Sequence, residues 1–95
     1  MSLYDQLKRY FEQYNELWHN KAAITRIEWK NAKDKTTYSP ENVGRRLRDL
    51  EQDHIICVRY DKHLNAEYRF IPVEWRDRYI DANARGQYVN EPMWK

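Results

Sequence analysis

Basic side chains are concentrated in one segment of this 95-residue chain. Residues 30–48 contain six lysines and arginines but only two carboxylates, those of Asp34 and Glu41. The segment therefore carries +4, and the rest of the chain carries −2 within the total of +2. Clustered lysine and arginine side chains neutralise phosphate groups and release their counterions, which is the chemistry of nucleic-acid binding. The segment is thus the best candidate in the chain for contact with a polyanion.

The strongest helix signals of the chain lie in the same segment. Ser39 is a favoured N-cap residue, and Pro40 suits the first helical position, where its missing N–H costs nothing. Three apolar residues then follow at the i, i+4, i+7 spacing of a core-facing helix: Val43, Leu47 and Leu50. We therefore expect a helix from Pro40 to Asp53 whose opposite face is exposed.

The outward face of this helix carries side chains that can read base edges. Arginine forms bidentate contacts to guanine from a helix in the major groove, and Asn or Gln forms them to adenine. The candidate contacts on the helix are Glu41, Asn42, Arg45, Arg46, Arg48 and Gln52. The free N–H groups at the helix start suit a phosphate, together with Lys33, Lys35, Thr37 and Ser39. The strands expected downstream add Arg59, Lys62 and Arg69.

A second interpretation of this helix face is that it is only solvated. Glu41, Arg45 and Asp49 stand at i, i+4 and i+8, the charge ladder of an exposed helix. Each such pair contributes only about 0.2–0.5 kcal/mol, so a phosphate can displace it. The sequence leaves both interpretations open.

The N-terminal residues predict a first helix. Ser2 can cap it, with Asp5 in the reciprocal position. Apolar residues then recur at helical spacing as far as Trp18, so the helix is expected to end near His19 or Asn20. We take this apolar stripe as core.

A second helix is expected from Arg26 to about Lys33. Thr25 and Glu28 have the spacing of a capping box. A short extended piece around residues 23–24 precedes this helix, and the polar residues 33–37 form the turn that follows it.

Two strands and a last helix are expected in the second half of the chain. Residues 55–60 and 66–71 read as strands, and the short turn between them makes an antiparallel hairpin. Pro72 ends the hairpin. Apolar residues from Val73 to Ile80 then suggest a helix that Gly86 closes.

This order of elements resembles a winged helix-turn-helix domain. The resemblance is most specific across Tyr38–Ile56, written YSPENVGRRLRDLEQDHII, with its capped Ser-Pro start and its exit into a strand. It implies an α+β fold over residues 1–72, with a three-helix core and a C-terminal β-hairpin wing, followed by a helix and tail over residues 73–95. It also implies that the third helix enters the DNA major groove, while the hairpin touches the backbone or minor groove.

Catalytic and metal chemistry is not expected. Two glycines cannot build a glycine-rich phosphate loop, and the single cysteine, Cys57, excludes an internal disulfide and a multi-cysteine zinc site. The three histidines have no ligand spacing, and no serine has a base in view. No cofactor is expected. The chain has no long apolar run and no signal peptide, so a cytoplasmic location is expected.

The C-terminal segment is more apolar than so small a core obviously needs. Its apolar residues either pack on the first helix or form an interface, most simply of a homodimer. The candidate interface residues are Trp75, Tyr79, Ile80, Tyr88 and Trp94. We expect a non-enzymatic duplex DNA-binding protein, a small transcriptional regulator of prokaryotic or phage type that acts as a dimer. The alternative is a winged-helix protein-interaction module without DNA affinity, which docks through the aromatic C-terminal segment.

Overall fold

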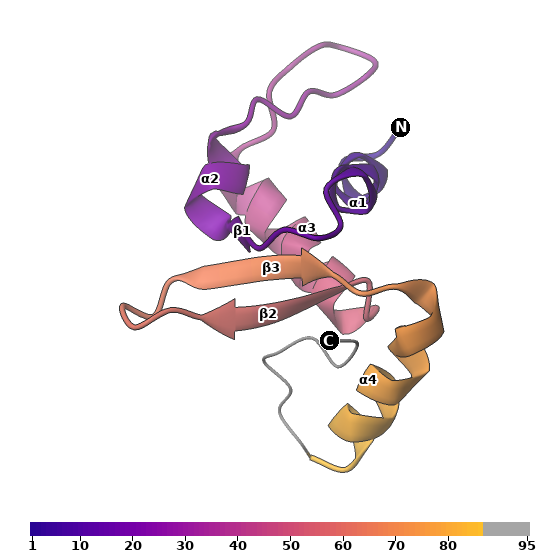
Figure 1. Ribbon diagram of the computed structural model, residues 1–95. Coiled ribbons are helices and arrows are strands. Elements are labelled where there is room, and N and C mark those ends of the chain that lie inside the picture. Colours follow the sequence, from indigo (N-terminus) through magenta and orange to yellow (C-terminus); the bar gives the residue numbers. More distant parts are fainter. Residues whose placement is uncertain (87–95) are drawn as a thin grey trace.

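The computed structural model describes residues 1–86 of the chain. Over these residues it is an α+β fold with four α-helices and a three-stranded antiparallel sheet (Figure 1). The elements in chain order are α1 (Leu3–Gln13), β1 (His19–Asn20), α2 (Lys21–Arg26), α3 (Pro40–Gln52), β2 (Ile56–Tyr60), β3 (Ala66–Phe70), a 3₁₀ turn (Val73–Trp75) and α4 (Arg76–Ala84). No helix among them is long and apolar enough to cross a membrane.

The expected hairpin forms and is joined by a third strand. The sheet order is β1-β3-β2, so the hairpin strand β3 is central. Val58 lies opposite Tyr68 in the hairpin, and His19 of β1 lies opposite Tyr68 on the other side. The sequence did not predict β1, because two residues are too few for a visible strand pattern.

Helix α1 is shorter than its apolar stripe predicts. Ser2 caps it as expected, since its Oγ accepts a hydrogen bond from the Asp5 N–H at 3.1 Å. The expected end at His19 or Asn20 is wrong, because the helix stops at Gln13 and the chain turns back into β1. The His19 ring lies 3.1 Å from the Tyr14 carbonyl oxygen. This contact occupies a carbonyl that a longer helix would use, so the polar ring holds the chain reversal in place.

The second helix lies earlier than expected, and its predicted span is wrong. Asn20 caps α2, because its Oδ1 accepts from the Ala22 N–H at 2.9 Å. The chain is extended at Ile27, and residues 29–38 form a hairpin-like loop in which the Tyr38 N–H donates to the Trp29 carbonyl at 2.8 Å. The Trp29 indole is buried, and its N–H donates to the carbonyl of Ile24 at 2.9 Å. Burying this large side chain outweighs the local capping box, which is worth about 1 kcal/mol.

Helix α3 forms as its sequence predicts. The Ser39 hydroxyl accepts from the Asn42 N–H at 3.2 Å, and Pro40 opens the first turn. The helix ends at Gln52, with Asp53 as its C-cap. Three residues bury its core face: Val43, Leu47 and Leu50.

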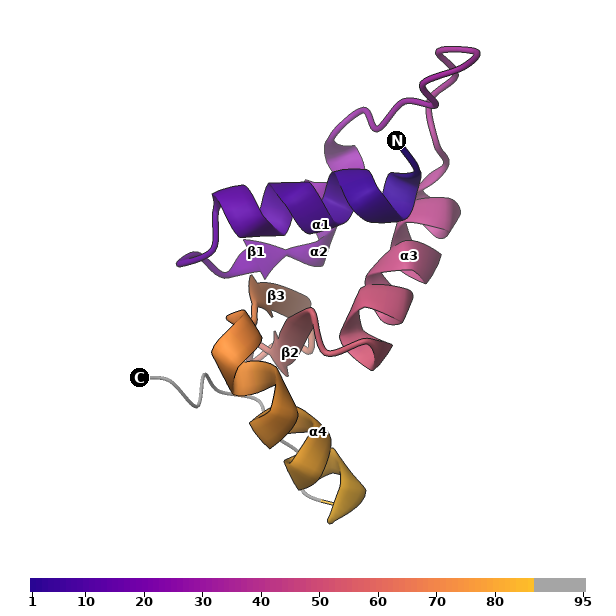
Figure 2. The same cartoon turned by 90° about the vertical axis from the view of Figure 1, so that its right-hand side faces the viewer.

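Side chains from both faces of the sheet are buried. Ile56, Val58 and Tyr68 pack with α1, α2 and α3 in the larger core. Cys57 and Ile71 point to the opposite face, where Tyr79 of α4 completes a smaller core. Figure 2 shows α4 on the far side of the sheet from the other helices. The last helix therefore packs on the sheet rather than on α1.

Candidate nucleic-acid interface

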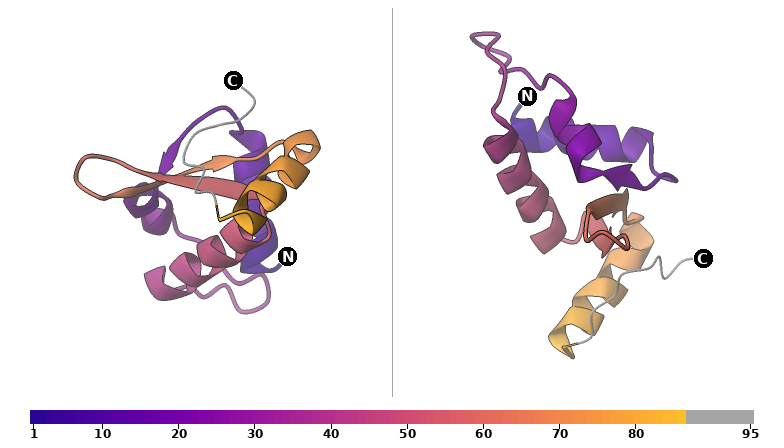
Figure 3. Two further views of the ribbon diagram at one scale, coloured as in Figure 1. Left: turned by 90° about the horizontal axis from the view of Figure 1, so that it is seen from below. Right: turned by 90° about the vertical axis from the view of Figure 1, so that its left-hand side faces the viewer.

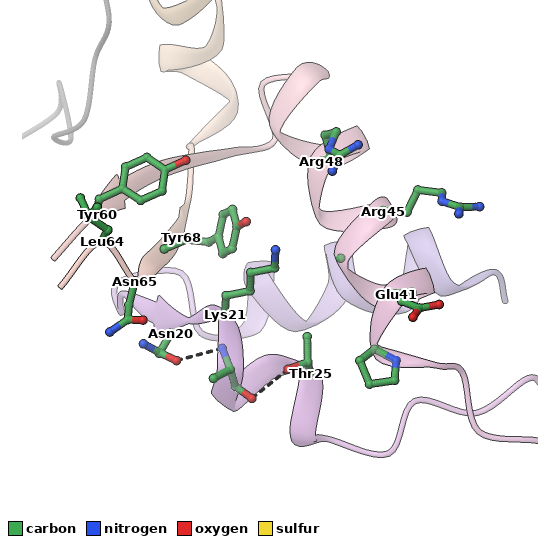
Figure 4. Close-up of a pocket in the computed structure, with 14 residues that line it drawn as sticks. Asn20, Lys21, Thr25, Glu41, Arg45, Arg48, Tyr60, Leu64, Asn65 and Tyr68 are labelled. Atoms are coloured by element: carbon green, nitrogen blue, oxygen red, sulfur yellow. Dashed lines mark hydrogen bonds between the residues drawn. The ribbon is translucent and has the colours of Figure 1, made fainter.

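A groove of about 830 Å³ lies between α2, α3 and the β2–β3 hairpin. Figure 3 shows these three elements from two further directions, and Figure 4 shows the side chains that line the space. We call it the α3 groove. Its lining residues are Asn20, Lys21, Ala22, Thr25, Pro40, Glu41, Gly44, Arg45, Arg48, Tyr60, Leu64, Asn65, Ala66 and Tyr68.

Three of the expected contact residues reach the α3 groove from α3. Glu41, Arg45 and Arg48 lie on the helix face opposite the buried residues. Both arginine side chains are exposed. Within residues 1–86, no carboxylate forms an ion pair with either of them. Both side chains are therefore open to an external anion, and the charge of Arg48 also acts on half-buried Glu51.

Lys21 adds a third cation that the sequence did not indicate. It is the first residue of α2, and its Nζ lies 3.9 Å from where a side chain on Gly44 would begin. The described part of the chain offers its amino group no ion pair. Sequence analysis missed it because the second helix was expected to begin five residues later, at Arg26. The available signal was Asn20, a good N-cap residue directly before it.

The hairpin loop forms the opposite wall of the groove and is held by Asp61. Its carboxylate accepts from the backbone N–H groups of His63 at 2.8 Å and Asn65 at 2.9 Å. These donors hold the pKa of Asp61 below its usual value. The turn places Leu64 outward with 80% of its surface exposed and a positive φ of 62°. A positive φ is unfavourable for leucine, so the loop geometry is set by the Asp61 hydrogen bonds.

Tyr68 contributes a buried ring and a hydroxyl group to the groove. Burial raises the pKa of Tyr68 to about 12, and the negative charge of Glu51 adds to this effect. The positive charge of Arg48, which lines the same groove, acts in the opposite direction on this pKa. The phenol is therefore protonated at neutral pH and can donate a hydrogen bond.

The other side of α3 does not face the groove. Arg46 pairs with Asp49 at 3.1 Å, so the expected ladder from Glu41 through Arg45 to Asp49 does not form as ion pairs. Asn42 is exposed but does not line the groove. Gln52 is exposed at the distant end of the helix.

The expected phosphate contacts before α3 lie on the loop of residues 29–38. Figure 1 shows this loop projecting past the start of α3. Lys33, Lys35 and Thr37 are exposed on it, and none of them lines the α3 groove. Ser39 uses its hydroxyl to cap the helix. Lys62 is exposed on the hairpin loop, also outside the groove.

Arg59 and Arg69 are not brought to the groove. Arg69 lies opposite Cys57 in the hairpin register and shares its face of the sheet, the one that α4 covers. Arg59 is on that same face, where its Nε lies 2.9 Å from Glu67 Oε1 and its guanidinium stacks 4.1 Å above the Trp18 ring. They therefore do not extend the basic strip of α3.

The candidate interface residues of the C-terminal segment divide between interior and surface. Tyr79 is only 3% exposed and packs within the chain on Cys57 and Ile71. Trp75 is half-buried, whereas Ile80 is 47% exposed. Tyr88 and Trp94 lie outside the described residues.

In comparisons with known proteins, the chain matches no family model, no curated protein sequence and no solved structure. Residues 1–86 contain no cluster of His, Cys, Asp and Glu that could hold a metal ion.

Proposed function

We propose that the protein is a non-enzymatic duplex DNA-binding protein that uses α3 and the β2–β3 hairpin together. In this proposal residues 1–72 are a winged helix-turn-helix domain, with α3 in the major groove and the hairpin on the adjacent backbone or minor groove. The observed element order and the antiparallel hairpin after α3 are compatible with that layout.

One observation carries the proposal: the α3 groove contains three cations without ion-pair partners among residues 1–86, and a single carboxylate. Lys21, Arg45 and Arg48 together with Glu41 leave a charge of +2 in the groove. Unpaired cations need not break an internal salt bridge before they bind phosphate. Each phosphate they neutralise releases counterions, which favours binding at low salt.

The dimer expectation is retained as part of the proposal. Ile80 on α4 and Val73 before it are exposed apolar residues, on the side of the sheet away from α3. A two-fold contact through this side would leave both α3 grooves free. Sedimentation of the full chain tests it: a monomer at all concentrations would reject the dimer without affecting the DNA proposal.

The test of DNA binding is fluorescence anisotropy of a labelled mixed-sequence duplex over a series of salt concentrations. We expect log affinity to fall linearly with log salt, with a slope of about −0.9 for each neutralised phosphate. The variant with Arg45→Glu and Arg48→Glu is expected to lose binding and to stay folded. Its melting temperature should fall only slightly, because the reversed charges repel Glu41 and Glu51 on the same helix.

A matched control carries the same change in net charge away from the groove. Arg9→Glu and Arg85→Glu alter exposed residues of α1 and of the turn after α4, and this variant should retain binding. Equal loss in both double variants would mean that total charge decides binding and would reject the assignment of α3. No binding by the folded wild type at low salt would reject DNA as the partner and favour the protein-interaction alternative.

A further inference from the structure

Gly44 is an unexpected residue in the middle of α3. A glycine in a helix interior is less stable than alanine, because it loses more backbone freedom on folding. The fold does not require it, since its φ is not positive and a Cβ would meet only Lys21 atoms at 3.7 and 3.9 Å, which are ordinary contacts. Because Gly44 has no side chain, the backbone of α3 is open to the groove at this position.

Hydrogen-bond donors surround this opening. Figure 4 shows the Lys21 amino group and the Tyr68 hydroxyl pointing into the space between α2, β3 and α3. Within residues 1–86, neither group has a hydrogen-bond partner. Arg48 lines the same space and is close enough to Tyr68 to influence the hydroxyl electrostatically. An ammonium, a guanidinium and a phenol hydroxyl all donate, so the complementary ligand is an oxyanion that only accepts.

Glu41 does not compete for this place. Figure 4 shows Glu41 and Arg45 projecting from the side of α3 away from Tyr68. The α3 groove therefore has an outer part, lined by Arg45 and Glu41, and an inner part, lined by Lys21, Arg48 and Tyr68. Lys21 and Arg48 bring two positive charges to the inner part, and the negative charge of Glu51 also acts on Tyr68 there. The balance of +1 favours an anion such as a phosphate group.

The proposed docking supplies such a phosphate. In duplex DNA a sugar–phosphate strand separates the major groove from the minor groove. If α3 occupies the major groove and the hairpin lies on the adjacent minor groove, that strand must pass between them. We infer that it crosses the α3 groove at Gly44, with one backbone phosphate bound by Lys21, Arg48 and the Tyr68 hydroxyl. This inference rests on the proposed DNA binding.

The first test removes one charge from the inner part. Lys21→Gln should weaken binding to all duplex sequences alike and make the salt slope shallower by about 0.9, as expected for one lost phosphate contact. The matched control Arg9→Gln removes one charge from the exposed surface of α1 and should leave the slope unchanged. Tyr68→Phe should weaken binding about 2- to 10-fold without changing the slope, since a neutral hydrogen bond is lost.

The second test closes the opening. Gly44→Leu should lower the affinity about tenfold or more, because the added side chain occupies the place of the strand. Leucine favours a helix, so this variant should melt at or above the wild-type temperature. Gly44→Ala is the control and should bind like the wild type, because its methyl group makes only ordinary contacts.

The outcomes separate this inference from the proposed function. Steep salt-dependent binding by the wild type, with unchanged slope in Lys21→Gln and unchanged affinity in Gly44→Leu, would overturn the phosphate assignment and leave DNA binding intact. No DNA binding by the wild type would overturn both.

A third test asks whether the inner part binds free phosphate instead of the DNA backbone. It compares the melting temperature of the protein in inorganic phosphate and in chloride at equal ionic strength. A stabilisation by phosphate that Lys21→Gln abolishes, with no effect of this variant on the DNA slope, would assign the place to a small phosphorylated ligand. That result would overturn its assignment to the DNA backbone.

Discussion

On the side of the sheet that α4 covers, arginine side chains are held by partners within the chain. Arg59 pairs with Glu67 and stacks on Trp18, and Arg78 stacks 4.1 Å above the Trp75 ring. Arg76 donates to the Ile71 carbonyl at 3.1 Å. Cation–π contacts of this kind contribute about 0.5–1 kcal/mol each at exposed sites. Arg76 therefore ties α4 to the end of β3, whereas Arg59 and Arg78 are held by Trp18 and Trp75.

On the α3 side, Arg46 pairs with Asp49, but the cations that line the groove form no ion pair among residues 1–86. Lys21, Arg45 and Arg48 line a groove in which Glu41 is the one carboxylate among the described residues. The difference teaches that the number of basic residues does not locate a binding surface. What distinguishes the two sides is whether each charge is already satisfied, because only an unsatisfied charge gains fully from an external phosphate.

The largest expected effect is a loss of stability on the side of the sheet that α4 covers. Tyr79→Ala removes a buried ring from a small core with few neighbouring apolar residues. We expect the free energy of unfolding in urea to fall by about 3 kcal/mol. DNA affinity per folded molecule should be unchanged, since α3 packs in the other core. A loss below about 1 kcal/mol would mean that α4 does not depend on Tyr79 for its attachment.

High pH should weaken the two sides over different ranges. Burial raises the pKa of Cys57, on the α4 side, from 9.0 to about 11, and that of Tyr68, at the groove, from 10.0 to about 12. In both cases the unfolded chain releases its proton first. Each neutral group therefore contributes its full stability below its pKa in the unfolded chain. That contribution is lost as the pH rises through its pKa in the folded chain. A shift of one unit corresponds to about 1.4 kcal/mol.

Two variants separate these contributions in urea unfolding across pH 8–12. Cys57→Ala should remove the part of the fall in the free energy of unfolding that begins near pH 9. Tyr68→Phe should remove the part that begins near pH 10. Tyr14→Phe serves as the control, because Tyr14 is exposed and does not influence the pKa of Cys57 or of Tyr68. Parallel curves for the wild type and both variants would contradict the burial of these groups.

A matched pair of substitutions sharpens the comparison at single residues. Arg59→Met should lower the free energy of unfolding by about 1 kcal/mol, through the loss of its ion pair and its stacking on Trp18, and should not alter DNA affinity. Arg48→Met should keep stability within about 0.5 kcal/mol and make the salt slope of DNA binding shallower by about 0.9. The opposite pattern, with Arg59 needed for binding and Arg48 for stability, would reverse the functional assignment of the two sides.

The elements predicted correctly are those specified by neighbouring residues. The Ser39 cap, Pro40 and the spacing of the apolar residues in α3 are local signals, and tertiary packing agrees with them. The second helix was misplaced because the local signal at Thr25 competes with the burial of Trp29, which only tertiary structure reveals.

The binding surface was predictable only in part for the same reason. The helical wheel of α3 predicts that Arg45 and Arg48 are exposed on one face. Lys21 joins them only because α2 packs beside α3 in the folded chain. Alternation in β3 separates Arg69 from Tyr68, but it does not say which face of the sheet meets α3. That choice depends on the packing of α4, which has no local signature in the hairpin.

The smallest expected effect concerns Gly44. Replacement by alanine should raise the free energy of unfolding by about 0.5–1 kcal/mol, because alanine reduces the freedom of the unfolded chain and fits the observed space. Thermal melting and urea unfolding measure this gain. An equal gain with unchanged DNA binding would show that the groove needs an opening rather than glycine itself. A loss of stability instead would mean that Lys21 cannot accommodate even a methyl group, and the α3 groove would be narrower than its 830 Å³ suggests.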